Sequence, residues 1–268
     1  MQAKIRCNNN LIGSGKGVSL PLARVFCLPE RVGRSEVPGK SRDPERVQVH
    51  DYMKQIILAS TSPRRAELLR QLGLEFKVVA SDVPEIHQEQ LTGRELAQIN
   101  AYRKARGVAK KNPDALVVGA DTLVCLNEVV FGKPATLEAA YEMLEELQGR
   151  THQVVSAICL LHLRSHRQKV FADLTAVTFR PLDAVKIRRY LTKVNPLDKA
   201  GGYAIQEEGD LIIEKISGSR TNVVGLPLER LKQELDGWAG ITVPWQAPLE
   251  VVAGHQKLHR HEPRPFRG

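Results

Sequence analysis

The chain has 268 residues, of which 42% are hydrophobic and 26% charged, the composition of an ordinary globular protein. Its formal net charge is +9, but residues 53–237 carry only +3, because 26 Lys and Arg stand against 23 Asp and Glu there. With 5% aromatic residues and no basic stripe, the composition argues against a nucleic-acid-binding surface, and no apolar run is long enough to cross a membrane.

The two ends of the chain differ in composition from its centre. Residues 1–52 are rich in Gly, Pro, Arg and Ser without a hydrophobic period. This predicts a disordered extension or a misassigned start, with Met53 as the true one, and a targeting segment is a further alternative. Residues 238–268 contain prolines and the stretch KLHRHEPRPFRG, which predicts a flexible tail. The folded domain is therefore expected to span residues 53–237.

Between these ends, short apolar runs alternate with amphipathic stretches. Strands are predicted at 55–59, 76–81, 115–126 (one or two strands), 154–163, 170–182 and 210–217, the fourth and fifth regions forming an antiparallel pair. Helices are predicted at 63–72, 95–110, 137–148, 184–191 and 227–235. The elements interleave without a strict βαβ rhythm, which predicts an α/β fold with a mixed sheet.

The four cysteines show no sign of a disulfide framework or a metal site. None belongs to a CxxC pair, and two lie in apolar runs that are predicted strands. Reduced, buried thiols are the simplest interpretation, so a cytoplasmic protein is expected.

The first predicted helix opens with an unusual charge. In ILASTSPRRAELL, residues 57–69, hydroxyl groups precede Pro63, and Arg64 and Arg65 fall in the first turn. Because the free N–H groups of a helix start carry partial positive charge, two cations there add repulsion that an anion would relieve. Hydroxyls such as that of Ser60 and two guanidiniums thus predict a phosphate or pyrophosphate site. The alternative is that both arginines face solvent or pair with acids such as Glu67.

An acidic residue interrupts one of the most apolar runs of the chain. Asp121 lies in VVGADTLV, where an ionised carboxylate is costly unless it is paired with a cation or bound to a metal. A lysine or a metal ion is therefore its expected partner. The alternative is an Asp that forms a turn between two strands.

Two lysines and one amide complete the set of candidate residues. Lys133 stands in the turn FGKP, and Lys104 lies on the helix that precedes the Asp121 strand. Gln206 follows the paired glycines of DKAGGYAIQEEG, and its amide can read a base edge by donating and accepting. Taken singly, the lysines read equally as solvated side chains, and the glycine stretch as a loop without a ligand.

Taken in order, six motifs carry more information than any one of them. LASTSPRRAELL, GADTLV, GKP, GRTHQVVS, DKAGGYAIQ and SRTNVVGLPL closely resemble the Maf-like family of nucleoside triphosphate pyrophosphatases, over roughly residues 54–235. The resemblance implies a mixed sheet with flanking helices and two lobes around a nucleotide cleft. It also implies a homodimer, a divalent metal ion such as Mg²⁺ or Mn²⁺, and hydrolysis of the α–β bond of a nucleoside triphosphate to the monophosphate and pyrophosphate.

The resemblance assigns a role to each candidate residue. It places Ser60, Arg64 and Arg65 in the phosphate-binding turn, and Lys104 and Lys133 on the triphosphate. Asp121 becomes the general base and a metal-linked carboxylate, and Glu85 in SDVPEIH a second metal ligand. Thr122, Arg64 and Gln206 match positions tied to base selection.

The base-selecting loop points to one branch of that family. GYAIQ resembles the branch acting on dTTP and UTP rather than the branch acting on methylated GTP. Three positions depart from the pattern, namely Ala204 and Glu207, where that branch often has glycine, and Pro84, which replaces an acidic neighbour of Glu85. These departures bear on base choice and metal affinity.

Two rival functions come from other classes. A nucleotide-binding regulator of cell division or septum formation would bind without turnover, but it has no need to keep a carboxylate base beside the phosphates. A nucleic-acid-binding module would show strong, salt-dependent binding, which the small charge of residues 53–237 does not favour.

Overall fold

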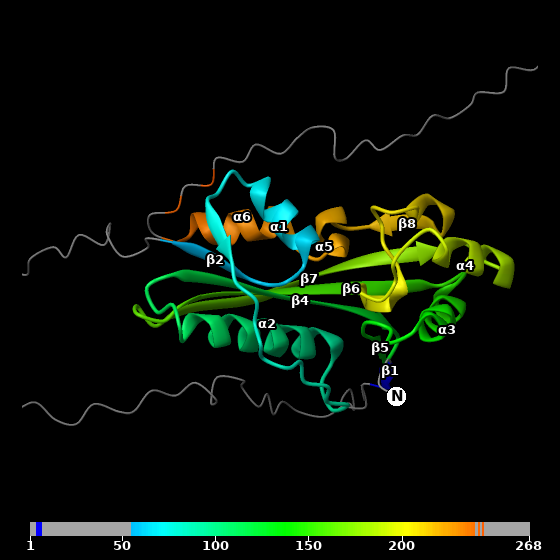
Figure 1. Cartoon of the computed structure of the whole chain (residues 1–268), viewed down its shortest axis with the longest axis horizontal. Coiled ribbons are helices and arrows are strands. Elements are labelled where there is room, and N and C mark those ends of the chain that lie inside the picture. The colour runs from blue at the N-terminus through cyan, green and yellow to red at the C-terminus, as the bar shows by residue number, and fades with distance from the viewer. Residues whose placement is uncertain (1–3, 7–54, 239–240, 242, 244–268) are drawn as a thin grey trace, which may run out of the picture.

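A mixed β-sheet forms the centre of the computed structural model, which describes residues 4–6, 55–238, 241 and 243 (Figure 1). Its strands are β1 (Lys4–Arg6), β2 (Ile56–Ala59), β3 (Phe76–Val78), β4 (Leu116–Leu126), β5 (Val129–Phe131), β6 (Thr151–His162), β7 (Arg167–Phe179) and β8 (Ile213–Ser217). The helices are α1 (Pro63–Arg70), α2 (Gly93–Ala109), α3 (Leu137–Leu147), α4 (Ala184–Leu191), α5 (Arg220–Val224) and α6 (Leu228–Asp236). The predicted α/β class and its mixed sheet are confirmed, and α5 is the helix that the sequence did not predict.

The sheet is split along one side of its long central strand, β4. The first part of β4 pairs in parallel with β2 up to Gly119, and its end pairs antiparallel with β5 from Val124 onward. Between these two pairings, residues 120–123 have no neighbouring strand on that side among the described strands. On its other side, β4 pairs with β6 almost throughout. The split therefore exposes a stretch of central strand to side chains from elsewhere.

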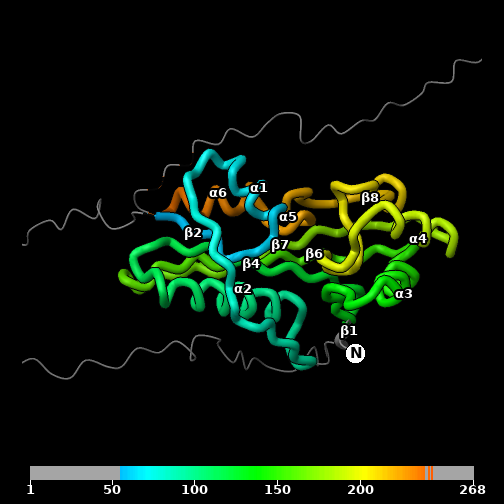
Figure 2. Tube along the Cα trace, viewed as in Figure 1, coloured from blue at the N-terminus to red at the C-terminus, as the bar shows by residue number. Residues whose placement is uncertain are grey.

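Helices cover both faces of the sheet. Figures 1 and 2 show α2 on one face, with α1 and α6 on the other. Alternating strand residues divide accordingly, since Val117 packs in the core under α2 while Val118 packs with α1 and α6. A third apolar core forms around α3 and α4 at the far end of the sheet. The split in β4 lies between this end and the lobe built on α1 and α2.

A glycine sets the distance between α2 and β4. A Cβ atom at Gly119 would overlap the carbonyl oxygen of Ala101 and press on Ala105, both on α2. The absence of a side chain lets the helix approach the strand closely. This approach brings the middle of α2, including Lys104, up to the split part of β4.

The structure changes both expected borders of the domain. Strand β1 pairs with β5, so residues 4–6 belong to the sheet, although they fall in the segment expected to lie outside the fold. The rest of the 1–52 prediction, including the start at Met53, falls on residues outside the described part and stays a prediction. Trp238, assigned to the tail, is only 5% exposed and packs in the core of α1 and α6, so the tail was drawn one residue too early at least.

Within the described ranges, no helix combines the length and the apolarity that a membrane crossing needs.

Candidate functional site

The start of α1 is open to an anion. Ser62 is the N-cap, but its side chain makes no capping hydrogen bond, and the first turn holds no acidic residue. The Ser60 hydroxyl accepts a hydrogen bond from the Ser62 amide at 3.2 Å, which turns the chain from β2 into the helix. The unpartnered amides and the partial positive charge of the helix end favour a phosphate at this point.

Arg65 is a structural anchor as well as a cation. Its Nε donates to the Gly225 carbonyl at 2.9 Å, one Nη donates to the Ala120 carbonyl at 3.1 Å, and the other donates to the Thr122 hydroxyl at 2.8 Å. The Ala120 carbonyl lies in the split of β4, where no strand is present to pair with it. Burial lowers the pKa of Arg65, although the carboxylates of Asp121 and Glu85 oppose this shift.

A buried chain of hydrogen bonds continues from Arg65. The Thr122 hydroxyl contacts the Ser156 hydroxyl at 2.9 Å, and Ser156 donates to the Asn222 carbonyl at 2.8 Å. The Asn222 amide in turn donates to the Val154 carbonyl at 3.0 Å. The motif SRTNVVGLPL therefore forms the wall that holds Arg65 and Thr122. The Thr122 hydroxyl is already engaged twice, so Thr122 contributes to the site mainly as a wall.

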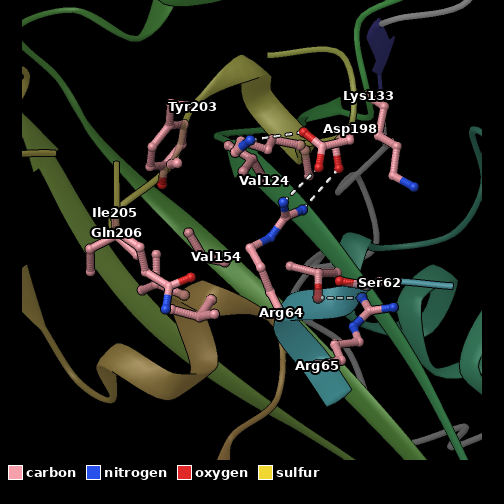
Figure 3. Close-up of a pocket in the computed structure, with 16 residues that line it drawn as sticks. Ser62, Arg64, Arg65, Val124, Lys133, Val154, Asp198, Tyr203, Ile205 and Gln206 are labelled. Carbon is pink, nitrogen blue, oxygen red and sulfur yellow. Dashed lines mark hydrogen bonds and ion pairs between the residues drawn. The ribbon is translucent and has the colours of Figure 1, made fainter. Parts of the chain in front are cut away.

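Arg64 points away from its neighbour (Figure 3). One Nη lies 2.6 Å from Oδ2 of Asp198, and the other donates to the Asp198 carbonyl at 3.1 Å. Glu67, the alternative partner considered from the sequence, pairs with Arg70 instead at 2.8 Å. Arg64 therefore does pair with an acid, as the alternative allowed, but the acid is Asp198 and not Glu67, whereas Arg65 binds carbonyl and hydroxyl groups.

Strand alternation separates Asp121 from Thr122. Thr122 faces α1, while Asp121 faces α2, where the Lys104 ammonium lies 2.6 Å from its Oδ1. The same ammonium lies 2.6 Å from Oε1 of Glu85, so Lys104 bridges the two carboxylates. Asp121 is 3% exposed, and its Oδ2 is buried without a hydrogen-bond partner among the described residues.

The two carboxyl groups respond differently to this environment. Burial raises the pKa of Asp121, and Lys104 only partly opposes this. Burial also works against the charged form of Glu85, but Lys104, Lys133 and Arg65 outweigh it and hold the Glu85 pKa below its usual value. The environment therefore moves the two pKa values in opposite directions, toward the protonated form for Asp121 and toward the ionised form for Glu85.

Lys133 and Gln206 lie at the opening of the site without partners of their own. Both are exposed, and neither makes a hydrogen bond or ion pair with another described residue. The turn that carries Lys133 is fixed, because the Gly132 carbonyl accepts a hydrogen bond from the Gly201 amide at 3.0 Å. Both side chains are therefore available to a ligand.

Two adjoining cavities collect the candidate residues. One of about 210 Å³ is lined by the β2–α1 turn with Ser60, together with Glu85 and Lys104. The other, about 80 Å³, is lined by Thr122, Tyr203 and Gln206 and is shown in Figure 3. Both cavities share a small set of lining residues, namely Ser62, Arg64, Arg65, Lys133 and Asp198. Nine site residues were predicted from the sequence. The structure brings eight of them to the cavity walls, and the ninth, Asp121, lies directly behind Lys104.

Sequence reasoning missed three contributors to this site. Asp198 and Lys199 were read only as part of a glycine-rich loop, and Ser156 only as part of a strand and as the end of one motif. The one signal for Asp198 was its place beside the paired glycines of DKAGGYAIQ. Ser156 ends the motif GRTHQVVS, but no pattern gave it a role, because that role depends on the pairing of β6 with β4 opposite Thr122.

The fold and the site define an α/β protein with a cavity lined by cationic side chains in front of a buried carboxylate. Residues 55–238 match the family of Maf-like proteins, and the chain belongs to this family. A dTTP/UTP pyrophosphatase of Pelotomaculum thermopropionicum is 46% identical over 183 residues, 68% of this chain and 96% of that protein. One from Acetivibrio thermocellus is 42% identical over 198 residues, 71% of this chain and 98% of that protein. Among solved structures, a HAM1 protein from Coxiella burnetii aligns with a TM-score of 0.41 and 19% identity, over 69% of this chain and 100% of that one.

Proposed function

We propose that the chain hydrolyses dTTP and UTP to the nucleoside monophosphate and pyrophosphate. The observation that carries this proposal is the bridge of Lys104 between Asp121 and Glu85 at the wall of a cation-lined cavity. The relatives named dTTP/UTP pyrophosphatase support the same activity, since nearly their whole length aligns with this chain.

The cationic side chains bind the triphosphate. Arg64 and Lys133 line both cavities, and Lys104 lines the larger one beside the start of α1. These cations and the free amides of α1 offset the charge that otherwise repels a nucleophile from the phosphate chain. They also stabilise the pyrophosphate as it leaves. Arg65 contributes its charge through the cavity wall, because three of its N–H groups already bind protein acceptors.

Asp121 is the general base in this proposal. Its unpartnered Oδ2 is free to accept a proton from a water molecule, and its raised pKa strengthens it as a base. The proton moves from water to this carboxylate while the water oxygen attacks the α-phosphorus and the bond to the leaving pyrophosphate breaks. Lys104 holds the other oxygen of the same carboxylate and fixes its direction.

A divalent cation, Mg²⁺ or Mn²⁺, fits the same residues. Among the described residues, no group of three or more His, Cys, Asp or Glu side chains gathers as a closed metal site. An open site with one or two carboxylates is, however, what magnesium uses when substrate phosphates and water complete its shell. The orphaned Oδ2 of Asp121 and the carboxylate of Glu85 would supply those ligands. When bound, the ion would neutralise phosphate charge and polarise the phosphoryl oxygen.

The smaller cavity is the proposed base pocket. Gln206 lies at its rim with an unengaged amide, which suits the adjacent acceptor and donor of the uracil or thymine edge. Thr122 forms part of the wall, and Arg64 stands where the two cavities meet. We expect higher kcat/KM for UTP and dTTP than for 7-methyl-GTP or ITP, and the opposite ranking would contradict this assignment.

Substitution of Asp121 tests the chemistry. Asn keeps the shape of Asp but accepts no proton, so Asp121→Asn should lower kcat on UTP with Mg²⁺ by about 10² or more, the scale of a lost general base. Lys104 keeps Glu85 as a partner, so the variant should fold, and a thermal melt checks this. A folded variant that hydrolyses UTP within a few-fold of wild type would remove Asp121 as the base and move the assignment to Glu85.

The same assay separates this proposal from a binding-only regulator of cell division. Wild-type protein that binds UTP but releases no pyrophosphate with Mg²⁺ or Mn²⁺ would favour the regulator. The expected homodimer, the cytoplasmic location and the absence of nucleic-acid and membrane partners stay predictions.

A further inference from the structure

Three charged residues enclose the glycine loop that ends at Gln206. Asp198 and Lys199 precede the short 3₁₀ turn η3 (Ala200–Gly202), and Glu207 follows Gln206. The Lys199 ammonium lies 2.9 Å from Oδ1 of Asp198 and 3.3 Å from Oε1 of Glu207. It also donates to the Asn195 carbonyl at 2.7 Å. Lys199 therefore joins the two ends of the loop, and we call Asp198, Lys199 and Glu207 the loop clamp.

Lys199 is committed to this role. Its side chain is only 5% exposed, its ammonium donates hydrogen bonds to the Asn195 carbonyl and to Oδ1 of Asp198, and it forms an ion pair with Glu207. A buried lysine that three oxygen atoms already surround is a poor partner for a phosphate. Glu207 is thus the second carboxylate that pairs with Lys199, and it closes the clamp in this chain.

Asp198 extends the clamp to the start of α1. Its Oδ2 and its carbonyl take both Nη groups of Arg64, at 2.6 and 3.1 Å. Its other oxygen is held by Lys199, and these two cations together lower the Asp198 pKa although partial burial opposes them. The charges of the four residues sum to zero, so Asp198 adds no net repulsion to the cavity edge where it stands.

The middle of the loop has supports of its own, but its end does not. The Tyr190 hydroxyl accepts from the Ala204 amide at 2.9 Å, and His152 contacts the Tyr203 hydroxyl at 2.8 Å. Gln206 lacks any hydrogen bond to a described residue. Its position therefore depends on Glu207, the next residue along the chain, and on what Glu207 binds.

We propose that the loop clamp is a positioning device for base selection, in which Asp198 sets the direction of Arg64 while Glu207 sets the place of Gln206. The proposal rests on the proposed function, because Arg64 and Gln206 are its candidate base readers. Asp198 and Glu207 are positioning residues that act through Arg64 and Gln206, and they take no part in the bond cleavage. The clamp thus accounts for a charged Glu207 next to a base-reading amide.

Three amide substitutions test the clamp by separating base recognition from phosphate binding. Asp198→Asn and Glu207→Gln keep the shape and remove the charge, and Glu208→Gln is the matched control, because Glu208 pairs with Lys193 at 2.9 Å outside both cavities. We expect each clamp variant to lower the kcat/KM ratio of UTP to CTP about tenfold, the scale of one charge-assisted hydrogen bond. The change should lie in the KM for UTP, with kcat within a few-fold of wild type.

A ligand without a base provides the second readout. Inorganic tripolyphosphate should inhibit wild type, Glu207→Gln and Glu208→Gln with the same Ki, because neither glutamate pairs with a cation that is proposed to bind the phosphates. A clamp variant that keeps the UTP-to-CTP ratio would overturn the proposal. So would an Asp198→Asn variant that binds tripolyphosphate and every nucleotide more tightly, because Asp198 would then be competing with phosphate for Arg64.

Failure of the proposed function gives a different result. Wild-type protein without pyrophosphate release contradicts the hydrolysis, and calorimetric binding of UTP and CTP to the same variants then tests the clamp. Loss of the binding preference in Asp198→Asn and Glu207→Gln, but not in Glu208→Gln, would still support it. Wild-type protein that neither binds nor hydrolyses UTP would overturn both proposals.

Discussion

The two adjacent arginines of α1 should differ strongly in how much stability the same substitution removes. Met reaches about as far as the Nε of Arg and has no hydrogen-bond donors, so Arg64→Met and Arg65→Met each remove one guanidinium and keep most of the apolar stem. Arg65 donates hydrogen bonds to three acceptors on two other segments, Gly225 and strand β4, whereas Arg64 pairs with Asp198 near the surface. We therefore expect Arg65→Met to lower the stability of the fold and Arg64→Met to leave it nearly unchanged.

The size of the difference follows from what each side chain leaves behind. Without Arg65, the carbonyls of Gly225 and Ala120 lose their donor, and a buried unsatisfied acceptor costs about 1–3 kcal/mol, so the pair costs about 2–6 kcal/mol. Thr122 keeps Ser156 as a partner. The side chains of Arg64 and Asp198 are 22% and 44% exposed, and an ion pair of this kind contributes about 0–1 kcal/mol.

Thermal unfolding followed by circular dichroism distinguishes the two variants. For a domain of this size, 1 kcal/mol shifts Tm by about 2–4 °C, so Arg65→Met should melt roughly 5–20 °C below wild type and Arg64→Met within about 4 °C of it. Arg70→Met is the matched control on the same helix, because Arg70 pairs only with exposed Glu67. Equal melting temperatures for the Arg64 and Arg65 variants, or a lower one for Arg64→Met, would refute the assignment of Arg65 as an anchor.

Two further predictions concern buried aromatic and imidazole groups. Burial lowers the pKa of His152 to about 4, so the unfolded chain takes up a proton below pH 6.5 that the folded chain refuses. The contribution of His152 to the free energy of unfolding should therefore fall by about 3 kcal/mol between pH 6.5 and 4 and level off below. Urea unfolding of His152→Gln should show a correspondingly smaller fall over this range. Equal pH slopes for wild type and variant would contradict this prediction. Trp238→Ala should cost about 3–5 kcal/mol, seen as a drop in Tm, because Trp238 is a core residue, and a drop of under 2 °C would return Trp238 to the tail.

Local signals were enough to predict most of the fold. Helix α3 illustrates this, since Thr136 caps it through the Ala139 amide and its apolar residues repeat at helical spacing. The antiparallel pairing of β6 with β7 likewise follows from two apolar runs about a polar turn. The burial of Trp238 was not predicted, because a single aromatic residue among glycines and prolines shows no periodicity. That burial depends on how α1 and α6 pack around it.

The site was predictable as a set of residues but not as a set of roles. Arg64 and Arg65 are consecutive in the same turn, and no local pattern says which one is buried. Lys104 was one lysine among many until the close approach of α2 to Gly119 placed it between Asp121 and Glu85. Such roles depend on contacts between residues far apart in the chain, which sequence periodicity does not record.

The split of β4 explains why the first turn of α1 tolerates two cations. A central strand without a neighbour leaves buried carbonyls that need donors, and the Ala120 carbonyl is one of them. Arg65 supplies that donor, so the repulsion from the helix dipole is offset by hydrogen bonds before any ligand arrives. Arg64 makes no such hydrogen bond to the described part of the sheet. It lies at the junction of the two cavities, paired with the carboxylate of Asp198. The two cations of this turn therefore have different explanations. Arg65 satisfies a buried carbonyl of the fold, whereas Arg64 lies where the proposed ligand would bind.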